Sequence, residues 1–241
     1  MHTVSREKAE IYARYRLPYS DDAVQFVLDQ IEPACRSVAD IGAGTGLLTR
    51  HFAGRVTTLY AVEPEPHMRA ILERDLAGVV SIGGTAEATG LPHRSVDLIV
   101  AANAYHRFDP VGALAEFGRI LRPGGWLAIF SYGFRPLPGD DLATRFPQWR
   151  ARQKEKYLTQ SPAHFFGKAV PTPHSFPQTR SETWDEYWGA VQAGMEAPSA
   201  ADDWFSAIEA AHRERFTSQA VDGILTVPYR TEVLLGQPLY E

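Results

Sequence analysis

Three glycines stand within five residues of the chain, directly after an apolar run. The run from Ser37 to Ile41 is interrupted only by Asp40, and Gly42, Gly44 and Gly46 follow it. Glycine lets the backbone turn tightly and lets a ligand lie close to the main chain. Free N–H groups at the start of a following helix favour an anionic group. The spacing therefore predicts a ligand-binding turn between a strand and a helix, and a tight turn without a ligand is the alternative.

A carboxylate ends the next apolar run along the chain. Glu63 follows Tyr60-Ala61-Val62 and comes 17 residues after Gly46. In nucleotide-binding α/β proteins, a carboxylate at this place accepts hydrogen bonds from ribose hydroxyls. A solvated acid at a strand end is the alternative. The glycine spacing is G-x-G-x-G, whereas dinucleotide enzymes carry G-x-G-x-x-G, so an NAD-dependent oxidoreductase is the less favoured interpretation.

The elements that must position these residues alternate between strand-like and helix-like runs. Such alternation is typical of βαβ units and a parallel sheet. The expected strands span 37–42, 57–62, 78–82, 96–101 and 126–131, with one or two more within 223–236. The expected helices span 5–16, 21–30, 47–52, 66–76, 110–121 and 202–215. Residues 133–200 are rich in proline and aromatic residues without a strand pattern, so we expect a mostly helical insertion there.

The composition excludes several classes of protein. The 241 residues are 44% hydrophobic and 22% charged, with a net charge of −5 and no run of Lys or Arg, which disfavours a nucleic-acid partner. Cys35 is the one cysteine, so no intrachain disulfide is possible. The first residues do not resemble a signal peptide, and no apolar stretch approaches the roughly 18 residues of a membrane span. We expect a cytoplasmic protein without membrane attachment, as a monomer or homodimer.

Five stretches, taken in order, resemble the motifs of class I S-adenosylmethionine-dependent methyltransferases. They are Asp40 to Gly46, Glu63-Pro64, Gly84 to Pro92, Ser95 to Ile99 and Leu121 to Gly125. The resemblance covers about 12–131, and within the class it is greatest to the ubiquinone/menaquinone and trans-aconitate methyltransferases. It implies an α/β fold: a Rossmann-like, mostly parallel seven-stranded sheet with helices on both faces and a helical cap inserted after the fifth strand.

The resemblance also implies a set of residues around S-adenosyl-L-methionine. Thr85 stands where many relatives have an aspartate, so Glu87 or a backbone group is the alternative contact to the adenine amine. The segment from Tyr12 to Tyr19 is similar to an N-terminal segment that folds over the cofactor. The implied cofactor-binding residues are Tyr15, Arg16, Asp40, Gly42, Ala43, Gly44, Gly46, Glu63, Pro64, Met68, Thr85, Ala86, Glu87 and Asn103.

The run from Ala101 to Asp109 bears on catalysis. It is similar to a His-Trp-Phe run of trans-aconitate-type enzymes, with Arg107 in place of Trp. His106 is the candidate general base because imidazole titrates near neutral pH, and a packing role is the alternative. If the acceptor is a carboxylate, no base is needed, and Arg16, Arg107 or Tyr105 orients it. Tyr105 is therefore the second catalytic candidate.

The acceptor-binding candidates come from the N-terminal segment, the run after the fourth expected strand and the insertion. They are Tyr19, Arg107, Trp184 and Trp188. The helical spacing of Trp184, Tyr187 and Trp188 favours packing over substrate binding. His164 and His174 have no second ligand at a metal-type spacing, so we expect no metal site.

Two units and one reaction follow from these interpretations. Residues 1–131 and 216–241 are expected to form the S-adenosylmethionine-binding domain with an N-terminal helical lid, and residues 132–215 a helical substrate-binding cap. The predicted reaction is in-line methyl transfer to a small organic molecule, with a carboxylate or hydroxyl acceptor. The alternative is an S-adenosylmethionine-binding protein with other chemistry or a non-catalytic partner role.

Overall fold

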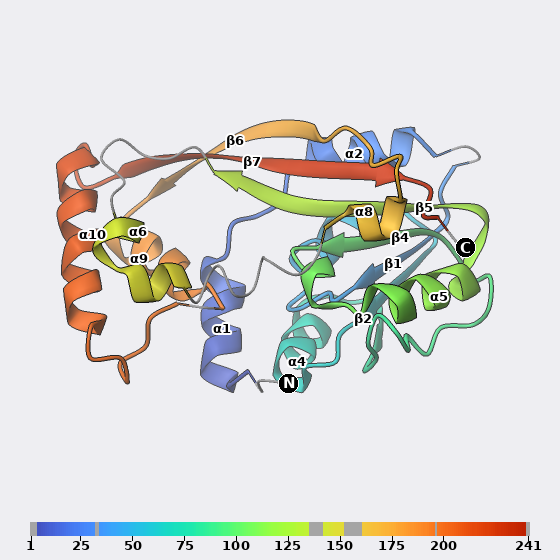
Figure 1. Ribbon diagram of the computed structural model, residues 1–241, viewed down its shortest axis with the longest axis horizontal. Helices are drawn as coiled ribbons and strands as arrows, with labels where there is room; N and C mark the ends of the chain where they lie inside the picture. The colour runs from blue at the N-terminus through green and yellow to red at the C-terminus, as the bar shows by residue number, and fades with distance from the viewer. Residues whose placement is uncertain (1–3, 32–33, 135–141, 152–160, 196, 240–241) are drawn as a thin grey trace.

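The computed structural model describes residues 4–31, 34–134, 142–151, 161–195 and 197–239. Its framework is a seven-stranded sheet in the order β3-β2-β1-β4-β5-β7-β6 (Figure 1). The strands are β1 (Ser37–Ile41), β2 (Thr58–Val62), β3 (Val80–Ile82), β4 (Val96–Ala102), β5 (Leu121–Phe134), β6 (His174–Glu182) and β7 (Leu225–Gly236). The helices are α1 (Arg6–Tyr15), α2 (Asp21–Asp29), α3 (Thr49–Phe52), α4 (Pro66–Asp75), the 3₁₀ helix η1 (Tyr105–Arg107), α5 (Pro110–Ile120), α6 (Leu142–Arg145), α8 (Ala163–Phe166), α9 (Trp184–Gln192) and α10 (Phe205–Gln219).

The sheet is mostly parallel, as the sequence predicts. The pairs β1–β2, β2–β3, β1–β4 and β4–β5 are parallel, and β7 runs antiparallel to both of its neighbours. All five residues of β1 are buried. An uninterrupted apolar run is what a central parallel strand requires, because helices cover both of its faces.

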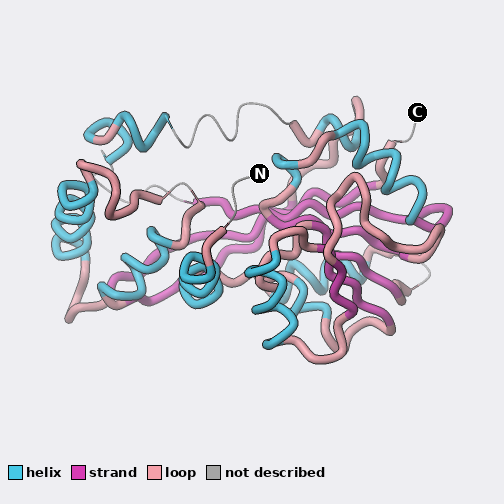
Figure 2. The backbone as a smooth tube through the Cα atoms, turned by 90° about the horizontal axis from the view of Figure 1, so that it is seen from below, coloured by secondary structure: helices cyan, strands magenta, loops and turns pink. Residues whose placement is uncertain are grey.

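Helices lie on both faces of the sheet, which confirms that prediction (Figure 2). Each face has its own apolar core. On one face α2 packs on the sheet through Ala23, Val24 and Val27, and α3 through Phe52; α4 adds Leu72 beside Ala61 of β2. On the other face α5 and α8 contribute residues that include Phe117, Phe165 and Phe166. The two cores fix the strand ends relative to one another.

Residues 122–125, within the last of the motif-like stretches, are part of a register shift between two strands. Val96 of β4 pairs with Leu121, but Leu98 pairs with Trp126, so the Arg-Pro-Gly-Gly residues bulge out of the ladder. Gly124 has a φ of +79°, a conformation that glycine adopts without strain. The expected helix at 47–52 is shorter than predicted: α3 begins at Thr49, and residues 47 and 48 belong to the turn that precedes it.

The prediction that residues 133–200 hold no strand is wrong for β6. This strand pairs along its whole length with β7, from His174 opposite Val233 to Glu182 opposite Leu225. Its burial alternates between exposed and half-buried residues up to Ser181. The strand therefore lacks the apolar signal of the central strands. Within the described residues of the insertion, α6, α8 and α9 are helical as expected.

Three strands continue past the end of β4. Pairing of β4 with β5 ends at Ala102 opposite Phe130, whereas β5 continues to Phe134 against β7. We call residues 131–134, 175–182 and 225–232 the ribbon. Figure 1 shows these long strands crossing the top of the molecule toward α9 and α10. The ribbon thus joins the carboxyl edge of the parallel sheet to the helices of the insertion.

Candidate cofactor and acceptor site

The glycine turn lies at the carboxyl end of β1, where the sequence predicts it. Gly42, Gly44 and Gly46 have φ values of +72°, +59° and +80°. A Cβ on Gly42 would lie 2.7 Å from Cβ of Ala104, so only glycine fits there. A Cβ on Gly44 would meet nothing within 4 Å. The backbone at Gly44 therefore faces open space that a ligand can occupy.

Glu63 lies beside this turn, at the end of β2. Its Oε2 accepts a hydrogen bond from Gly44 N at 2.7 Å, and its Oε1 accepts one from Glu65 N at 2.8 Å. Burial raises the pKa of this carboxyl, whose residue is only 7% exposed. A carboxylate has about four lone-pair sites, so Glu63 keeps acceptor capacity for ligand hydroxyls. The glycine turn and the Glu63 carboxylate are therefore in direct contact.

Asp40 is fully buried directly beneath the turn. Its Oδ2 accepts a hydrogen bond from Thr49 Oγ1 at 2.6 Å, whereas its Oδ1 has no hydrogen-bond partner. Burial, with a smaller contribution from the charge of Glu63, raises the pKa of Asp40 to about 7. The hydroxyl of nearby Thr45 is also buried without a partner. Unpaired buried polar atoms are costly, so this site is suited to a ligand that brings hydrogen-bond donors and a positive charge.

The loop after β3 closes one side of the site. Thr85 N donates to Ala88 O at 3.1 Å and Ala88 N donates to Thr85 O at 3.3 Å, so the loop is a tight turn. Glu87 Oε1 accepts a hydrogen bond from Asp109 N at 2.8 Å, and Ala86 is buried. The loops that follow β3 and β4 are thereby joined, although β2 and β1 lie between those strands.

Asn103 joins the end of β4 to the N-terminal segment. Its backbone is left-handed, with a φ of +49°, which Asn tolerates better than most residues. Its Nδ2 donates to Tyr19 Oη at 2.8 Å, and the Tyr19 ring stacks on Tyr132 at 4.6 Å between centroids. The Tyr132 hydroxyl donates to Leu17 O. This network holds the segment before α2 against the carboxyl ends of β4 and β5.

The N-terminal helix supplies two more of the predicted residues. The Arg16 guanidinium lies over the rings of Tyr12 and Tyr132, at 5.6 and 5.3 Å from their centroids. Tyr15 packs against α9 instead, because a Cβ on Gly189 would lie 2.5 Å from its ring. Figure 1 shows α1 lying between α4 and α9. The structure thus brings Arg16, but not the Tyr15 ring, to the aromatic network above β5.

The catalytic candidates lie on η1, two residues past Asn103. His106 is buried, and its ring centroid lies 5.9 Å from that of Tyr105. Arg107 is exposed, and its positive charge opposes the effect of burial on the pKa of Glu63. The three residues therefore lie at the carboxyl edge, while their catalytic and acceptor roles stay predictions.

The remaining candidates lie in packed clusters. Met68 packs with Val4, Ala9 and Ile71 where α1 meets α4. Trp184 and Trp188 stack on one another at 5.8 Å, and Trp188 lies 5.4 Å from the ring of His212 on α10. These contacts agree with the packing interpretation of the two tryptophans.

Three residues of this region are not among the site residues predicted from the sequence. Thr49 bonds to Asp40 from the first turn of α3, and Tyr132 stacks on Tyr19. Tyr132 lies two residues after buried Phe130, and that alternation places both on one face of β5. Thr49 gives no such signal, because its role depends on how α3 folds back over β1. Arg230 on β7 gives none either, because its contact with Gly133 is made across strands.

Among the residues that the structure describes, no group of three or more His, Cys, Asp or Glu side chains is arranged to hold a metal ion. None of the helices described is both long and apolar enough to cross a bilayer.

Comparison with known proteins agrees with this geometry. Residues 39–129 match a family model described as a methyltransferase domain. An uncharacterized methyltransferase of Mycobacterium tuberculosis is 41% identical over 118 residues, which cover 49% of this chain and 47% of that protein. A Schizosaccharomyces pombe protein described as methyltransferase-like is 32% identical over 106 residues, covering 44% of this chain and 40% of the relative. The chain spans about half the length of the curated relatives it matches.

Solved structures share the fold. A structure from Anaeromyxobacter dehalogenans, described as a candidate type II methyltransferase, aligns with a TM-score of 0.69 at 24% identity, covering 92% of this chain and 98% of that one. The YcgJ protein of Bacillus subtilis aligns with a TM-score of 0.51 at 20% identity, covering 90% and 97%. The segment that matches the methyltransferase domain model, residues 39–129, thus holds the glycine turn, Glu63 and Asn103.

Proposed function

We propose that the protein is an S-adenosylmethionine-dependent methyltransferase that acts on a small organic molecule. The observation that carries the proposal is the contact between Gly44 N and the buried Glu63 carboxylate, at 2.7 Å, inside the segment that matches a methyltransferase domain. The net charge of −5 favours a small acceptor over a nucleic acid.

The residues present fit S-adenosylmethionine in three ways. Gly44 leaves open space against the backbone, Glu63 keeps acceptor capacity for ribose hydroxyls, and Asp40 supplies a buried carboxyl group. Asp40 Oδ1 lacks a partner, which suits a cationic ligand. When bound, the sulfonium supplies an activated methyl group. The protein has to hold the acceptor in line and exclude water, effects that contribute several kcal/mol to catalysis.

The acceptor side of the site would lie above β4 and β5. Asn103, Tyr19 and Tyr132 form a hydrogen-bonded and stacked wall there. His106 is our candidate base for an acceptor that must lose a proton, and Arg107 or Tyr105 would orient a carboxylate. The supporting observation is that η1 follows the end of β4 directly.

Isothermal titration of the full chain with S-adenosylmethionine tests the proposal. We expect micromolar binding that Glu63→Ala weakens at least tenfold, or about 1.4 kcal/mol. Glu63→Gln keeps the side-chain volume, so it separates loss of charge from loss of packing around Gly44 N. Glu73→Ala is the matched control, because Glu73 is an exposed carboxylate on α4 that pairs with Arg69.

Two results would overturn parts of the proposal. Binding of NADH without binding of S-adenosylmethionine would show that the glycine turn binds a dinucleotide, as in NAD-dependent oxidoreductases. Binding without formation of S-adenosylhomocysteine across an acceptor screen would favour the non-transferring alternative.

A further inference from the structure

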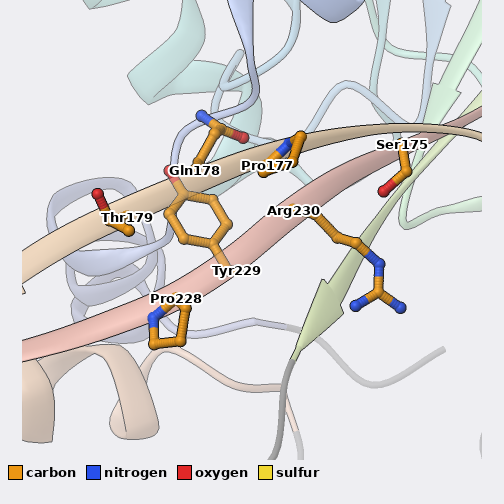
Figure 3. A pocket seen from close by; sticks show the side chains of 7 residues that line it. All are labelled: Ser175, Pro177, Gln178, Thr179, Pro228, Tyr229 and Arg230. Carbon is orange, nitrogen blue, oxygen red and sulfur yellow. The ribbon is translucent and has the colours of Figure 1, made fainter.

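A hollow of about 480 Å³ lies on the ribbon, between β6 and β7 (Figure 3). Its walls include Ser175, Pro177 and Thr179 from β6, and Pro228, Tyr229 and Arg230 from β7. Figure 3 shows Pro228 and Arg230 extending from the same side of β7, with Tyr229 extending from the other side. The lining thus combines a cation and hydroxyls with the apolar rings of two prolines.

Arg230 lies across the neighbouring strand at a glycine. Gly133 of β5 pairs with Arg230, and a Cβ at Gly133 would lie 2.5 Å from Arg230 Nε and 2.6 Å from Cζ. Any larger residue at 133 would displace the guanidinium. Glycine at this position therefore lets Arg230 lie flat across β5, toward the side where β4 ends.

Among the residues that the structure describes, only one side chain engages the guanidinium of Arg230. Within the described part of the chain it makes one ion pair, in which Nε donates to Glu232 Oε1 at 2.6 Å. This contact fixes the guanidinium and leaves Nη1 and Nη2 for another acceptor. The side chain is 41% exposed, so a ligand can reach it. Paired donors on a fixed guanidinium suit a carboxylate.

Arg230 lies opposite a part of β5 that extends beyond the carboxyl end of β4, and this position suits an acceptor rather than a cofactor. Phe130 O accepts the hydrogen bond from Asn103 N that marks the end of β4. Gly133 lies three residues farther along β5, or about 10 Å at the usual rise of a strand. An acceptor has to lie beyond the carboxyl ends of β4 and β5 if the cofactor occupies the glycine turn.

We propose that Arg230, lying across Gly133 beside this hollow, binds a carboxylate group of the methyl acceptor. The inference rests on the proposed function and adds to it the substrate class: a small organic acid whose apolar part lies against Pro177 and Pro228. Arg230 is an anchor for the acceptor, and the methyl group goes to whichever acceptor atom this anchoring brings in line.

The test uses the full chain saturated with S-adenosylhomocysteine. Ligand-observed NMR compares small carboxylic acids, each paired with its own primary carboxamide and with a phosphate monoester of similar carbon skeleton. We expect carboxylates to bind and Arg230→Gln to weaken them at least tenfold, with carboxamides changed less than twofold. Arg230→Lys should restore part of the affinity, because it keeps the charge without the paired donors.

Two further variants keep the result interpretable. Gly133→Ala retains the arginine but displaces it, so it should also weaken the carboxylates. Arg55→Gln removes an equal charge from an exposed residue that bonds to Gln25 near α3, and it should leave them unchanged. Equal binding of acids and carboxamides, hits confined to phosphate esters, or acids unaffected by Arg230→Gln would overturn the proposal.

A separate measurement distinguishes failure of the proposed function from failure of the Arg230 proposal. Calorimetry with S-adenosylhomocysteine reports on the glycine turn alone, and Arg230→Gln should leave that affinity unchanged. If S-adenosylhomocysteine does not bind, the methyltransferase proposal fails. The same panel on the ligand-free protein then decides whether Arg230 binds carboxylates.

Discussion

Comparing alanine substitutions at Gly44 and Gly54 separates the loss of a ligand contact from the cost of backbone strain. Their φ values are +59° and +76°, and a Cβ at either position would meet nothing within 4 Å. Alanine in this left-handed region costs roughly 1–2 kcal/mol at both positions. Only Gly44 faces the proposed cofactor, so Gly44→Ala should weaken S-adenosylmethionine binding at least tenfold while Gly54→Ala leaves it unchanged.

Urea unfolding and calorimetry on both variants check this prediction. Similar losses of stability with different binding would support a ligand at the turn. Equal binding by the two variants would contradict it.

Asp40 makes the stability of the ligand-free protein depend on pH. Its pKa is raised from 3.8 to about 7 by burial, so the folded protein holds a proton there that the unfolded chain has lost. This contribution to stability is complete below pH 3.8 and is lost as the pH rises through about 7. Between pH 6 and 8 the free energy of unfolding should fall by roughly 1–2 kcal/mol on this account. Asp40→Asn should remove that part of the slope, as measured by urea unfolding at several pH values.

The site residues that sequence can predict are those whose role depends on the local backbone. The turn at Gly42, Gly44 and Gly46, and Glu63 at a strand end, are both signalled by short stretches of chain. Thr49 and Arg230 act through contacts made across the fold, at Asp40 and at Gly133. No local pattern distinguishes them from other polar residues.

At the scale of elements, Asp97 joins three strands at the edge opposite the site. Its Oδ2 accepts hydrogen bonds from Arg36 N, Ser37 N and Ser37 Oγ, each at 2.9 Å, and Arg122 Nη1 donates to its Oδ1 at 2.5 Å. Hydrogen bonds to charged groups contribute about 1.5–3 kcal/mol each, and their effects overlap. Asp97→Ala should lower the free energy of unfolding by roughly 2–4 kcal/mol.

The binding readout distinguishes this residue from the site. Affinity for S-adenosylmethionine, measured where the variant is fully folded, should match the wild type, because β1 separates Asp97 from the turn. A tenfold loss of affinity would show that the amino edge is coupled to the site.

The elements differ in how far sequence predicts them, and the reason is burial. Central strands such as β1 and β4 are buried along most of their length and mostly apolar, and the helices alternate with them. The edge strand β6 is instead formed by polar residues that bond to β7, with Pro177 in its middle. Its existence depends on β7, which lies more than forty residues farther along the chain, so its own sequence carries little signal.

At the scale of the molecule, the insertion has its own pH-dependent residue. His212 is 2% exposed, its Nδ1 lies 2.8 Å from Tyr187 Oη, and its Nε2 has no hydrogen-bond partner. Burial, together with the charge of Arg215, lowers its pKa from 6.5 to about 4. The folded protein therefore binds fewer protons than the unfolded chain between these values, so stability is lost as the pH falls from about 6.5 toward 4.

The size of this effect follows from the pKa difference. Between pH 7 and 5, roughly 2 kcal/mol should be lost through His212. His212→Asn keeps a group that can bond to Tyr187 but does not titrate, so it should lose less stability over the same range. Urea unfolding at pH 7 and pH 5 compares the two, and identical losses would contradict the assignment.

The antiparallel position of β7 has a consequence for synthesis of the chain. About 90 residues separate the end of β5 at Phe134 from the start of β7 at Leu225. At 5–20 residues per second, a ribosome takes on the order of ten seconds to cover that distance. During this interval the nascent chain presents β5 as an open, apolar edge, the kind of edge that pairs with other chains. The yield of folded protein would then depend on how well that edge is shielded from other chains during synthesis.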